Sequence, residues 1–251
     1  MKRLAGSRLL IAALSLIVLA VLVGLGTWQL ERLEWKRALI AAASERPGSA
    51  AVPPPGPDTW SNFPIDDWNY QRVRLTGQFG EGEAHAWTVL GSPKGGSYRG
   101  DGYFVVAPFI TEDGWTVLVN RGFIPETRKD GGTRPAEVRP NQPVSVEGII
   151  RRDDPPSMFT PEPSPITNTW FTRDITTMGD FLKVSPNALA PYTVDLVAEE
   201  TPPSGLPQAG ESQITFTNNH VQYAVTWYGL AAAFLGVLIV AAFRSRQSAR
   251  S

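Results

Sequence analysis

The chain has 251 residues, with 23 Lys and Arg against 24 Asp and Glu, no cysteine and two histidines. Its near-neutral charge gives no basic footprint for nucleic acid, so we expect no nucleic-acid partner. The absence of cysteine excludes disulfides, thiolate zinc sites and iron–sulfur ligation. Any metal chemistry must therefore use very few ligands, with His85 and His220 as the available imidazoles.

Two long segments without charge are predicted to cross a membrane. Residues 9–30 and 221–243 contain no Asp, Glu, Lys or Arg, and about 20 residues at 1.5 Å each span a hydrocarbon core of about 30 Å. The first segment is longer than the usual signal-peptide core of about 7–15 residues, so we expect a retained anchor. Strong helix formers continue after it, which predicts a helix that extends to about residue 43.

The flanking charges predict the orientation. Basic residues lie before the first span and after the second: Lys2, Arg3, Arg8, Arg244, Arg246 and Arg250. By the positive-inside rule, residues 1–8 and 244–251 are cytoplasmic and residues 44–213 form an external domain. We expect a multi-pass protein of the cell inner membrane with its central domain in the periplasm. In a eukaryote the equivalent place is the mitochondrial inner membrane, with the domain facing the intermembrane space.

The middle region is predicted to be rich in β-strands. Short runs of β-branched and aromatic residues, bounded by Gly, Pro or Asp, predict strands within residues 70–79, 85–90, 102–110, 115–124, 143–152 and 192–199. Glu112–Gly114 is a hairpin signal, and residues 177–184 are the best candidate for a short helix. The predicted fold class is an α+β membrane protein. Its two transmembrane helices flank an external, mainly antiparallel β domain, either a sheet or a partly closed barrel.

Polar and aromatic residues form stripes where the spans meet the outer surface. Trp28, Arg32 and Trp35 share one helix face, with Gln29 on an adjoining polar face, and the second span has a stripe of His220, Tyr223, Ala224 and Trp227. Antiparallel spans bring these stripes to one depth. An imidazole for iron, a guanidinium for a propionate and aromatic rings for the macrocycle would suit a haem at the outer leaflet.

Simpler interpretations remain open for the same residues. Trp28, Trp35, Tyr223 and Trp227 are also typical of an interfacial aromatic belt. His220 can serve as a hydrogen-bonding residue between helices, and Arg32 can extend to lipid phosphates. His85 is expected to be a solvated side chain on a strand.

Four motifs in order resemble the Surfeit locus protein 1 family. They are "LGTWQLERLEWK" at 25–36, "VLVNRGFIP" at 117–125, "TWFTRDI" at 169–175 and "NNHVQYAVTWYGLA" at 218–231. The family layout of two spans around one external domain covers nearly the whole chain. Phe123 stands where the family more often has Trp, which keeps an aromatic ring at that position.

The resemblance implies a role in assembling cytochrome c oxidase of the respiratory chain. It implies a chaperone that handles haem a transiently, with His220 as the iron ligand and Arg32, Gln29, Trp28, Tyr223 and Trp227 as further candidate residues of the haem pocket. The implied partners are the catalytic subunit of the oxidase and haem A synthase, with membrane lipid around the spans. Arg121 and Arg173 either contact a partner or a propionate, or clamp the β domain through a carboxylate or an aromatic ring. The alternative function is a structural scaffold for oxidase subunits that binds no haem.

Catalysis and copper delivery are not expected. The sequence has no Gly-rich phosphate loop, no G-x-S-x-G elbow and no histidine pair at zincin spacing. Copper(I) carriers use thiolate or thioether ligands, and this chain has only the unclustered Met1, Met158 and Met178.

Overall fold

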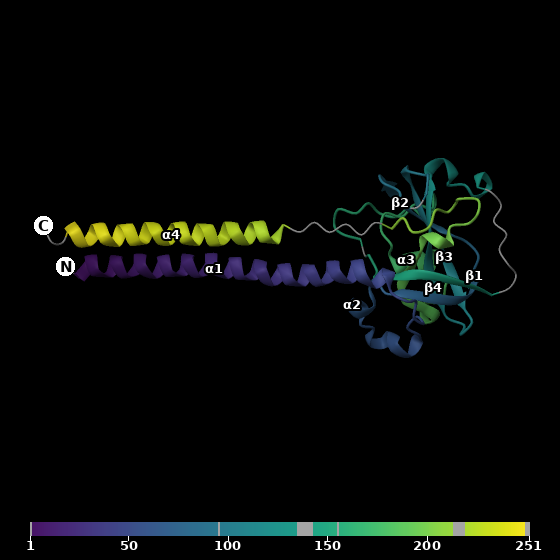
Figure 1. Cartoon of the computed structure of the whole chain (residues 1–251), viewed down its shortest axis with the longest axis horizontal. Coiled ribbons are helices and arrows are strands. Elements are labelled where there is room, and N and C mark those ends of the chain that lie inside the picture. The colour runs from purple at the N-terminus through teal and green to yellow at the C-terminus, as the bar shows by residue number, and fades with distance from the viewer. Residues whose placement is uncertain (1, 95, 135–142, 155, 213–218, 249–251) are drawn as a thin grey trace. The chain divides into compact units, whose positions relative to one another are not determined.

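The computed structural model describes the chain except for residues 1, 95, 135–142, 155, 213–218 and 249–251 (Figure 1). The chain divides into two units, one of Met1–Ala41 with Thr215–Ser251 and one of Ala42–Ile214. The part of the predicted C-terminal flank beyond Ser248 lies outside the described residues.

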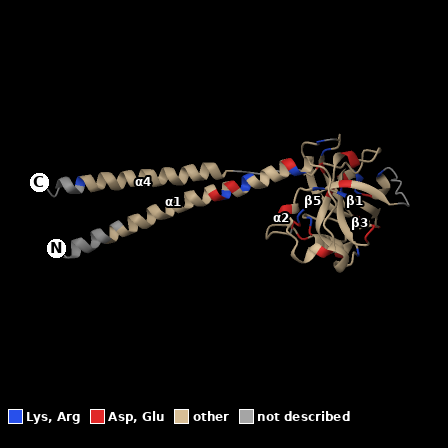
Figure 2. Ribbon diagram, turned by 60° about the horizontal axis from the view of Figure 1, so that its bottom comes forward, with Lys and Arg blue, Asp and Glu red and all other residues tan. Residues whose placement is uncertain are grey.

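The first unit is built from two long helices, α1 (Lys2–Glu45) and α4 (His220–Ser248). The candidate membrane spans are Ala13–Gly48, which runs from α1 through the 3-10 turn after it, and His220–Arg244 in α4, each with a mean hydropathy of 2.0. In each span, 11% of the most apolar window is buried inside the structure. A core helix of a soluble protein would be mostly covered, so both helices have the length, composition and exposure of a membrane protein. Figure 2 shows one long stretch without charged residues in α4, up to a basic residue near its C-terminal end, and another in α1 before the charged residues in the second half of that helix.

The second unit is a closed barrel of five strands with a sixth strand added at one side. The barrel runs β1-β5-β6-β4-β3 and closes through pairing of residues 77–79 of β1 with 109–111 of β3. β2 pairs with β3 alone among the named strands, and the β4–β6 pair is parallel while the others are antiparallel. The strands are β1 (Arg72–Phe79), β2 (Ala84–Leu90), β3 (Gly100–Thr111), β4 (Thr116–Pro125), β5 (Val144–Arg151) and β6 (Leu189–Leu196). The predicted fold class is confirmed, and the choice left open between sheet and barrel is resolved as a closed barrel.

The alternation in β1 shows how the sequence forms this barrel. Val73 and Leu75 point into the core and are at most 1% exposed. Arg72 and Arg74 take the opposite face, where they bind Glu147 of β5 at 2.8 and 2.6 Å. A strand with one apolar and one charged face is expected where one side packs on a core and the other meets water.

The predicted hairpin between β3 and β4 is also present. Gly114 has φ +84°, a conformation that glycine adopts without steric cost, and the Thr111 N–H donates to the Trp115 carbonyl at 2.8 Å. Both faces of β4 are buried, because its inner face fills the barrel and its outer face is covered by later segments of the chain.

One of the covering segments is the short helix α3 (Ile175–Phe181). The predicted helix is present but begins earlier than expected, because the Asp174 carboxylate accepts the N–H groups of Thr176 and Thr177 and caps it. Its buried face, with Ile175 and Met178, packs with Leu118 of β4 in a second apolar cluster outside the barrel. The remaining short helices are α2 (Ile65–Trp68) and 3-10 turns at 46–48, 57–62, 126–128, 131–133, 186–188 and 198–200.

The expectation that His85 is solvated was wrong. The residue lies on β2 but is 5% exposed, because a distant segment lies along the outer edge of that strand. The backbone N–H of Trp170 donates to the His85 carbonyl at 2.9 Å. The backbone N–H of His85 donates to Oδ1 of Asn168 at 3.1 Å. The imidazole Nε2 lies 2.9 Å from a carboxylate oxygen of Glu83.

Candidate functional site

The candidate site lies where α1 and α4 meet side by side (Figure 1). The buried residues of this helix pair recur at helical spacing: Gly26, Gln29 and Leu33 on α1, and Ala224 and Ala231 on α4. The small residues among them, Gly26, Ala224 and Ala231, let two helix backbones approach closely in an apolar environment.

Tyr228 fixes how closely the helices approach. Its hydroxyl lies 3.1 Å from Oγ1 of Thr27, and its ring lies directly over Gly26. A Cβ placed on Gly26 would be 2.8 Å from a ring carbon of Tyr228, closer than Cβ contacts in real structures.

A second contact joins the two helices nearby, where His220 Nδ1 lies 2.8 Å from Oε1 of Gln29. An amide oxygen only accepts, so in this bond the imidazole Nδ1 carries the proton and donates. The tautomer that has its proton on Nδ1 has its lone pair on Nε2, the arrangement found in metal-binding histidines whose second nitrogen is held by an acceptor. Gln29 is 8% exposed, so the acceptor is itself fixed by packing.

The other residues predicted for this site are arranged differently. Trp28 and Tyr223 are 52% and 54% exposed, which leaves their rings on the outside of the helix pair, and Trp227 is half-buried. The Arg32 guanidinium lies over the Trp35 ring of its own helix, 4.1 Å from the centroid. The structure therefore brings Gln29 and His220 together, leaves Trp28 and Tyr223 mostly exposed, and pairs Arg32 with Trp35 of its own helix.

The donor set fits a haem better than a bare metal ion. Across the residues described, no group of three or more His, Cys, Asp or Glu side chains is arranged to hold a metal ion. A porphyrin brings its own four nitrogen ligands, so one oriented imidazole supplies an axial ligand. His220, with Gln29 behind it, has the chemistry for that role.

The two arginines predicted for partner contact lie within the barrel unit and clamp it. Nη1 of Arg173 donates to both carboxylate oxygens of Asp195 at 2.9 Å, and Asn120 Nδ2 donates to the same carboxylate at 3.1 Å. Arg121 is 5% exposed and lies over the Phe79 ring, 4.7 Å from its centroid. These are the carboxylate and aromatic contacts that the second interpretation of both residues describes.

Asp195 is the centre of a buried charged cluster. Burial disfavours its charged form, but Arg173 and Arg151, with hydrogen bonds from Ser212 and Arg173, outweigh burial and hold the pKa of Asp195 below its usual range. Nη1 of Arg151 lies 3.7 Å from Oδ2 of Asp195. Burial lowers the pKa of Arg151, and the charge of Asp195 opposes that shift. Asp195 was not among the residues predicted from the sequence, although a lone acidic residue inside the apolar run "YTVDLV" indicates a buried partner for a cation.

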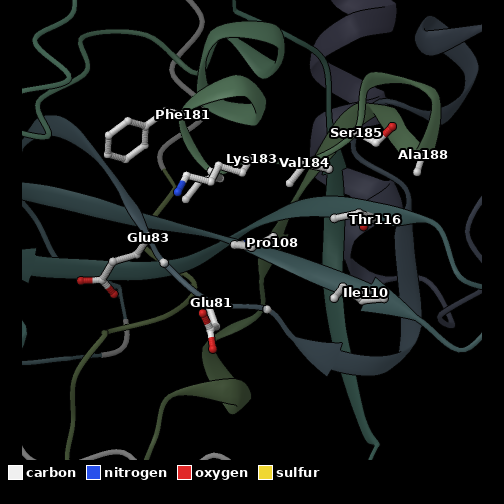
Figure 3. A pocket seen from close by; sticks show the side chains of 13 residues that line it. Glu81, Glu83, Pro108, Ile110, Thr116, Phe181, Lys183, Val184, Ser185 and Ala188 are labelled. Carbon is white, nitrogen blue, oxygen red and sulfur yellow. The ribbon is translucent and has the colours of Figure 1, made fainter.

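Two hollows lined by described residues open on the barrel unit. A mainly apolar pocket of about 600 Å³ lies between the turn at 80–83 and the segment after α3, with Pro108 and Ile110 between them (Figure 3). Lys183 projects beside it from a backbone with φ +57°. A second, more polar hollow of about 180 Å³ is lined by Ala86, Trp87, Thr88, Phe104, Asp154, Phe171, Thr172, Arg173 and Ser212. The second hollow is smaller than the 300–1,000 Å³ typical of small-molecule sites, which excludes it as a haem pocket.

The fold and the helix pair define a class of protein. It has a β-barrel unit and two helices that are long and apolar enough to cross a membrane, and one imidazole is held by a hydrogen bond from one helix to the other. The model of the SURF1 family matches residues 16–232. Over 236 residues the chain is 33% identical to a SURF1-like protein of Monosiga brevicollis, covering 89% of this chain and 84% of that one. It is 32% identical to Surfeit locus protein 1 of Mus musculus over 234 residues, and of Homo sapiens over 229. Each match covers 87% of this chain, with 71% of the mouse protein and 73% of the human one. This chain belongs to the SURF1 family.

Proposed function

We propose that this protein is an assembly factor for cytochrome c oxidase that holds haem a transiently through His220. The observation that supports this most directly is the 2.8 Å contact between His220 Nδ1 and Gln29 Oε1. It orients the imidazole and assigns its lone pair to Nε2, which is the nitrogen that ligates iron when Nδ1 donates to an acceptor.

When haem is present, its iron supplies the coordination centre and its macrocycle supplies a large apolar surface. The protein's own contribution is to position the side chains that would hold the haem. Gln29 holds the ring plane of His220, and Trp28 and Tyr223 present exposed aromatic faces near the same ends of the helices. A single axial imidazole on an open surface suits a carrier, because a fully enclosed site would retain its cargo.

A structural scaffold is the second candidate, and the same contact favours it. A polar pair between two apolar helices stabilises their association even without a ligand. In that case the contact between His220 and Gln29 serves helix association, and the barrel unit holds the assembling subunits.

Visible spectroscopy distinguishes the two functions. The full chain is purified in detergent from cells that make haem a, as wild type and as His220→Asn, which retains a side-chain donor for Gln29 but loses the imidazole. The control is Gln222→Ala, which removes an exposed polar side chain in the same turn of α4. We expect a Soret band in the wild type and the control and its loss in His220→Asn. A colourless wild type, or a band that survives in His220→Asn, contradicts the haem-ligand role.

We further infer that the protein resides in an inner membrane with both termini in the cytoplasm. Basic residues lie before the first span and after the second, at the ends that lead to the two termini. Its partners in this proposal are the catalytic subunit of the oxidase and haem A synthase. Periplasm-dependent reporters fused within the barrel unit should be active, whereas fusions after Arg244 should be inactive. Co-purification from the same membranes identifies the partners.

A further inference from the structure

The loop that connects β5 to α3 exposes large apolar side chains outside both hollows and outside the helix pair. At its base the Asp154 N–H donates to the Arg173 carbonyl at 3.3 Å, so the two ends of the loop lie together. We call its residues 156–168 the proline-rich loop, since Pro156, Pro161, Pro163 and Pro165 lie in it. Compact loops with joined ends are frequently functional.

The first exposed pair lies in a hydrogen-bonded turn. Met158 and Phe159 are 92% and 90% exposed. The flanking residues close the turn around them, because the Thr160 N–H donates to the Ser157 carbonyl at 3.0 Å and the Ser157 N–H donates to the Thr160 hydroxyl at 2.9 Å. The two apolar side chains are therefore held outward by a defined backbone.

A second turn exposes Ile166, which is 99% exposed. Ser164 and Thr169 pair across its base through bonds of 2.8 and 3.0 Å between their backbone N–H and C=O groups. Lys129 anchors the same turn from a different part of the chain, with Nζ donating to the Thr167 carbonyl at 2.8 Å and to the Thr169 hydroxyl at 2.7 Å.

These exposed side chains do not stabilise the fold. A side chain that is nine-tenths exposed buries almost no apolar surface, so it provides little hydrophobic stabilisation in the isolated chain. Scattered exposed apolar residues are ordinary, but apolar residues at the tips of two braced turns form a prepared contact surface. Turns that are already ordered lose little entropy when a partner covers them.

The charges around the tips indicate what covers them. Glu162 is the charged residue within the proline-rich loop itself and lies exposed between the two turns, whereas the Lys129 ammonium beside the second turn is engaged by Thr167 and Thr169. An anionic lipid surface would repel the Glu162 carboxylate, as would the same loop of a second copy. A complementary surface is apolar at its centre and has Lys or Arg at its rim.

We propose that the proline-rich loop docks into an apolar groove with a basic rim on a partner protein, with Met158, Phe159 and Ile166 as the inserted side chains. None of these residues belongs to the helix pair, so this docking does not depend on haem binding. Large apolar anchors at the centre of an interface contribute most of the binding energy, and the charges at the rim contribute orientation.

The test is photo-crosslinking in intact membranes that are assembling the oxidase. The full chain carries p-benzoylphenylalanine at position 159 or, as the control, at position 113, which is an exposed turn position between β3 and β4. We expect a product from position 159 but not from 113, with the crosslinked residue lying in an apolar patch flanked by Lys or Arg. Products that contain lipid, a second copy of this chain or a polar or acidic surface overturn the proposal. Equal yields from positions 159 and 113 also overturn it.

Variants then separate docking from folding. Combining Met158→Ser with Phe159→Ser, or reversing the charge with Glu162→Lys, should reduce the yield of a crosslinker at position 166 by about tenfold or more. Asp113→Lys should leave that yield unchanged. The thermal unfolding midpoint of the serine variant should stay at the wild-type value, and a clear fall would assign these side chains a structural role instead.

If haem is not bound by the wild type but the crosslink persists, the haem proposal fails and the docking proposal stands.

Discussion

The Arg173 guanidinium and the Asp195 carboxylate form a buried ion pair, in which Nη1 donates to both carboxylate oxygens, and it joins the chain after the proline-rich loop to β6. Both N–O distances are 2.9 Å, and Asp195 is 3% exposed. Arg151 also faces this carboxylate, so Asp195 compensates two cations, with a smaller contribution from Asp154. The motif "TWFTRDI" is thereby tied to the barrel, so the segment before it has a fixed base.

Replacing Asp195 with Asn should strongly destabilise the protein. The change removes the carboxylate that Arg151 and Arg173 share and leaves them the weaker influence of Asp154. Removing one partner of a buried pair costs about 3–5 kcal/mol. Chemical unfolding of the full chain in detergent measures the loss. Glu147→Gln is the matched control, because Glu147 also binds two arginines but does so near the surface, where salt bridges contribute little. Similar losses for the two variants would contradict the buried role of Asp195.

Stability should fall with pH as Glu83 takes up a proton. Burial disfavours its charged form, but hydrogen bonds from His85 and Arg134 and their charges outweigh this and lower the pKa of Glu83 from 4.5 to about 2. A lowered folded-state pKa contributes stability that is fully present above about pH 4.5 and is lost as the pH falls toward 2.

Glu83→Gln should therefore lower stability at neutral pH and reduce its decline over that pH range. Unfolding curves recorded from pH 7 downward measure both effects. Glu81→Gln, an exposed neighbour, serves as the control. A variant profile parallel to that of the wild type would show that Glu83 is not the titrating group.

Replacing Lys183 with Gly should stabilise the barrel unit by about 1 kcal/mol. Lys183 ends α3 in a left-handed conformation with φ +57°, and its neighbours complete a Schellman motif through Val184 N–H to the Gly179 carbonyl at 2.9 Å. Glycine adopts this conformation without the steric cost of a Cβ. Lys183→Ala removes the charge but retains the Cβ, so it should give no such gain. Equal stabilisation by both variants would point to charge and not to backbone strain.

Replacing Gly26 with Val should weaken the helix pair. The new Cβ would lie 2.8 Å from the Tyr228 ring, so the ring must move away from Thr27, and overpacking of this kind costs about 1–3 kcal/mol. Gly24→Val is the matched control, since nothing lies within 4 Å of a Cβ there. Energy transfer between labels on α1 and α4 measures the association. An unchanged signal for Gly26→Val would contradict this packing.

Local sequence patterns predicted most of the elements for identifiable reasons. The alternation of Val73 and Leu75 with two arginines has the period of a strand with one buried face, and the hairpin signal before Trp115 is a local turn property. Long uncharged runs predicted the two helices because 20 apolar residues have few other stable environments. The helix start at Ile175 was missed because the cap at Asp174 was not used.

Long-range pairing was less predictable. Barrel closure depends on residues 77–79 meeting 109–111. Gly77 permits this, since a Cβ there would lie 2.1 Å from the Ile110 carbonyl oxygen. A glycine inside a strand pattern signals such a close approach, but it does not identify the other strand. In the same way, no local pattern around His85 indicates that Asn168 and Trp170 cover it.

The sequence by itself determined the spans, the strands, the two-unit layout and the family, because each of these depends on composition, periodicity or motifs read along the chain. Only the tertiary structure decided that the sheet closes, that His220 faces Gln29, that Arg173 binds Asp195 and that Met158 and Phe159 remain uncovered. These facts concern which distant side chains meet and which do not. They follow from packing the whole chain at once, since a residue's burial and its partners are set by segments that its own neighbours in sequence do not specify.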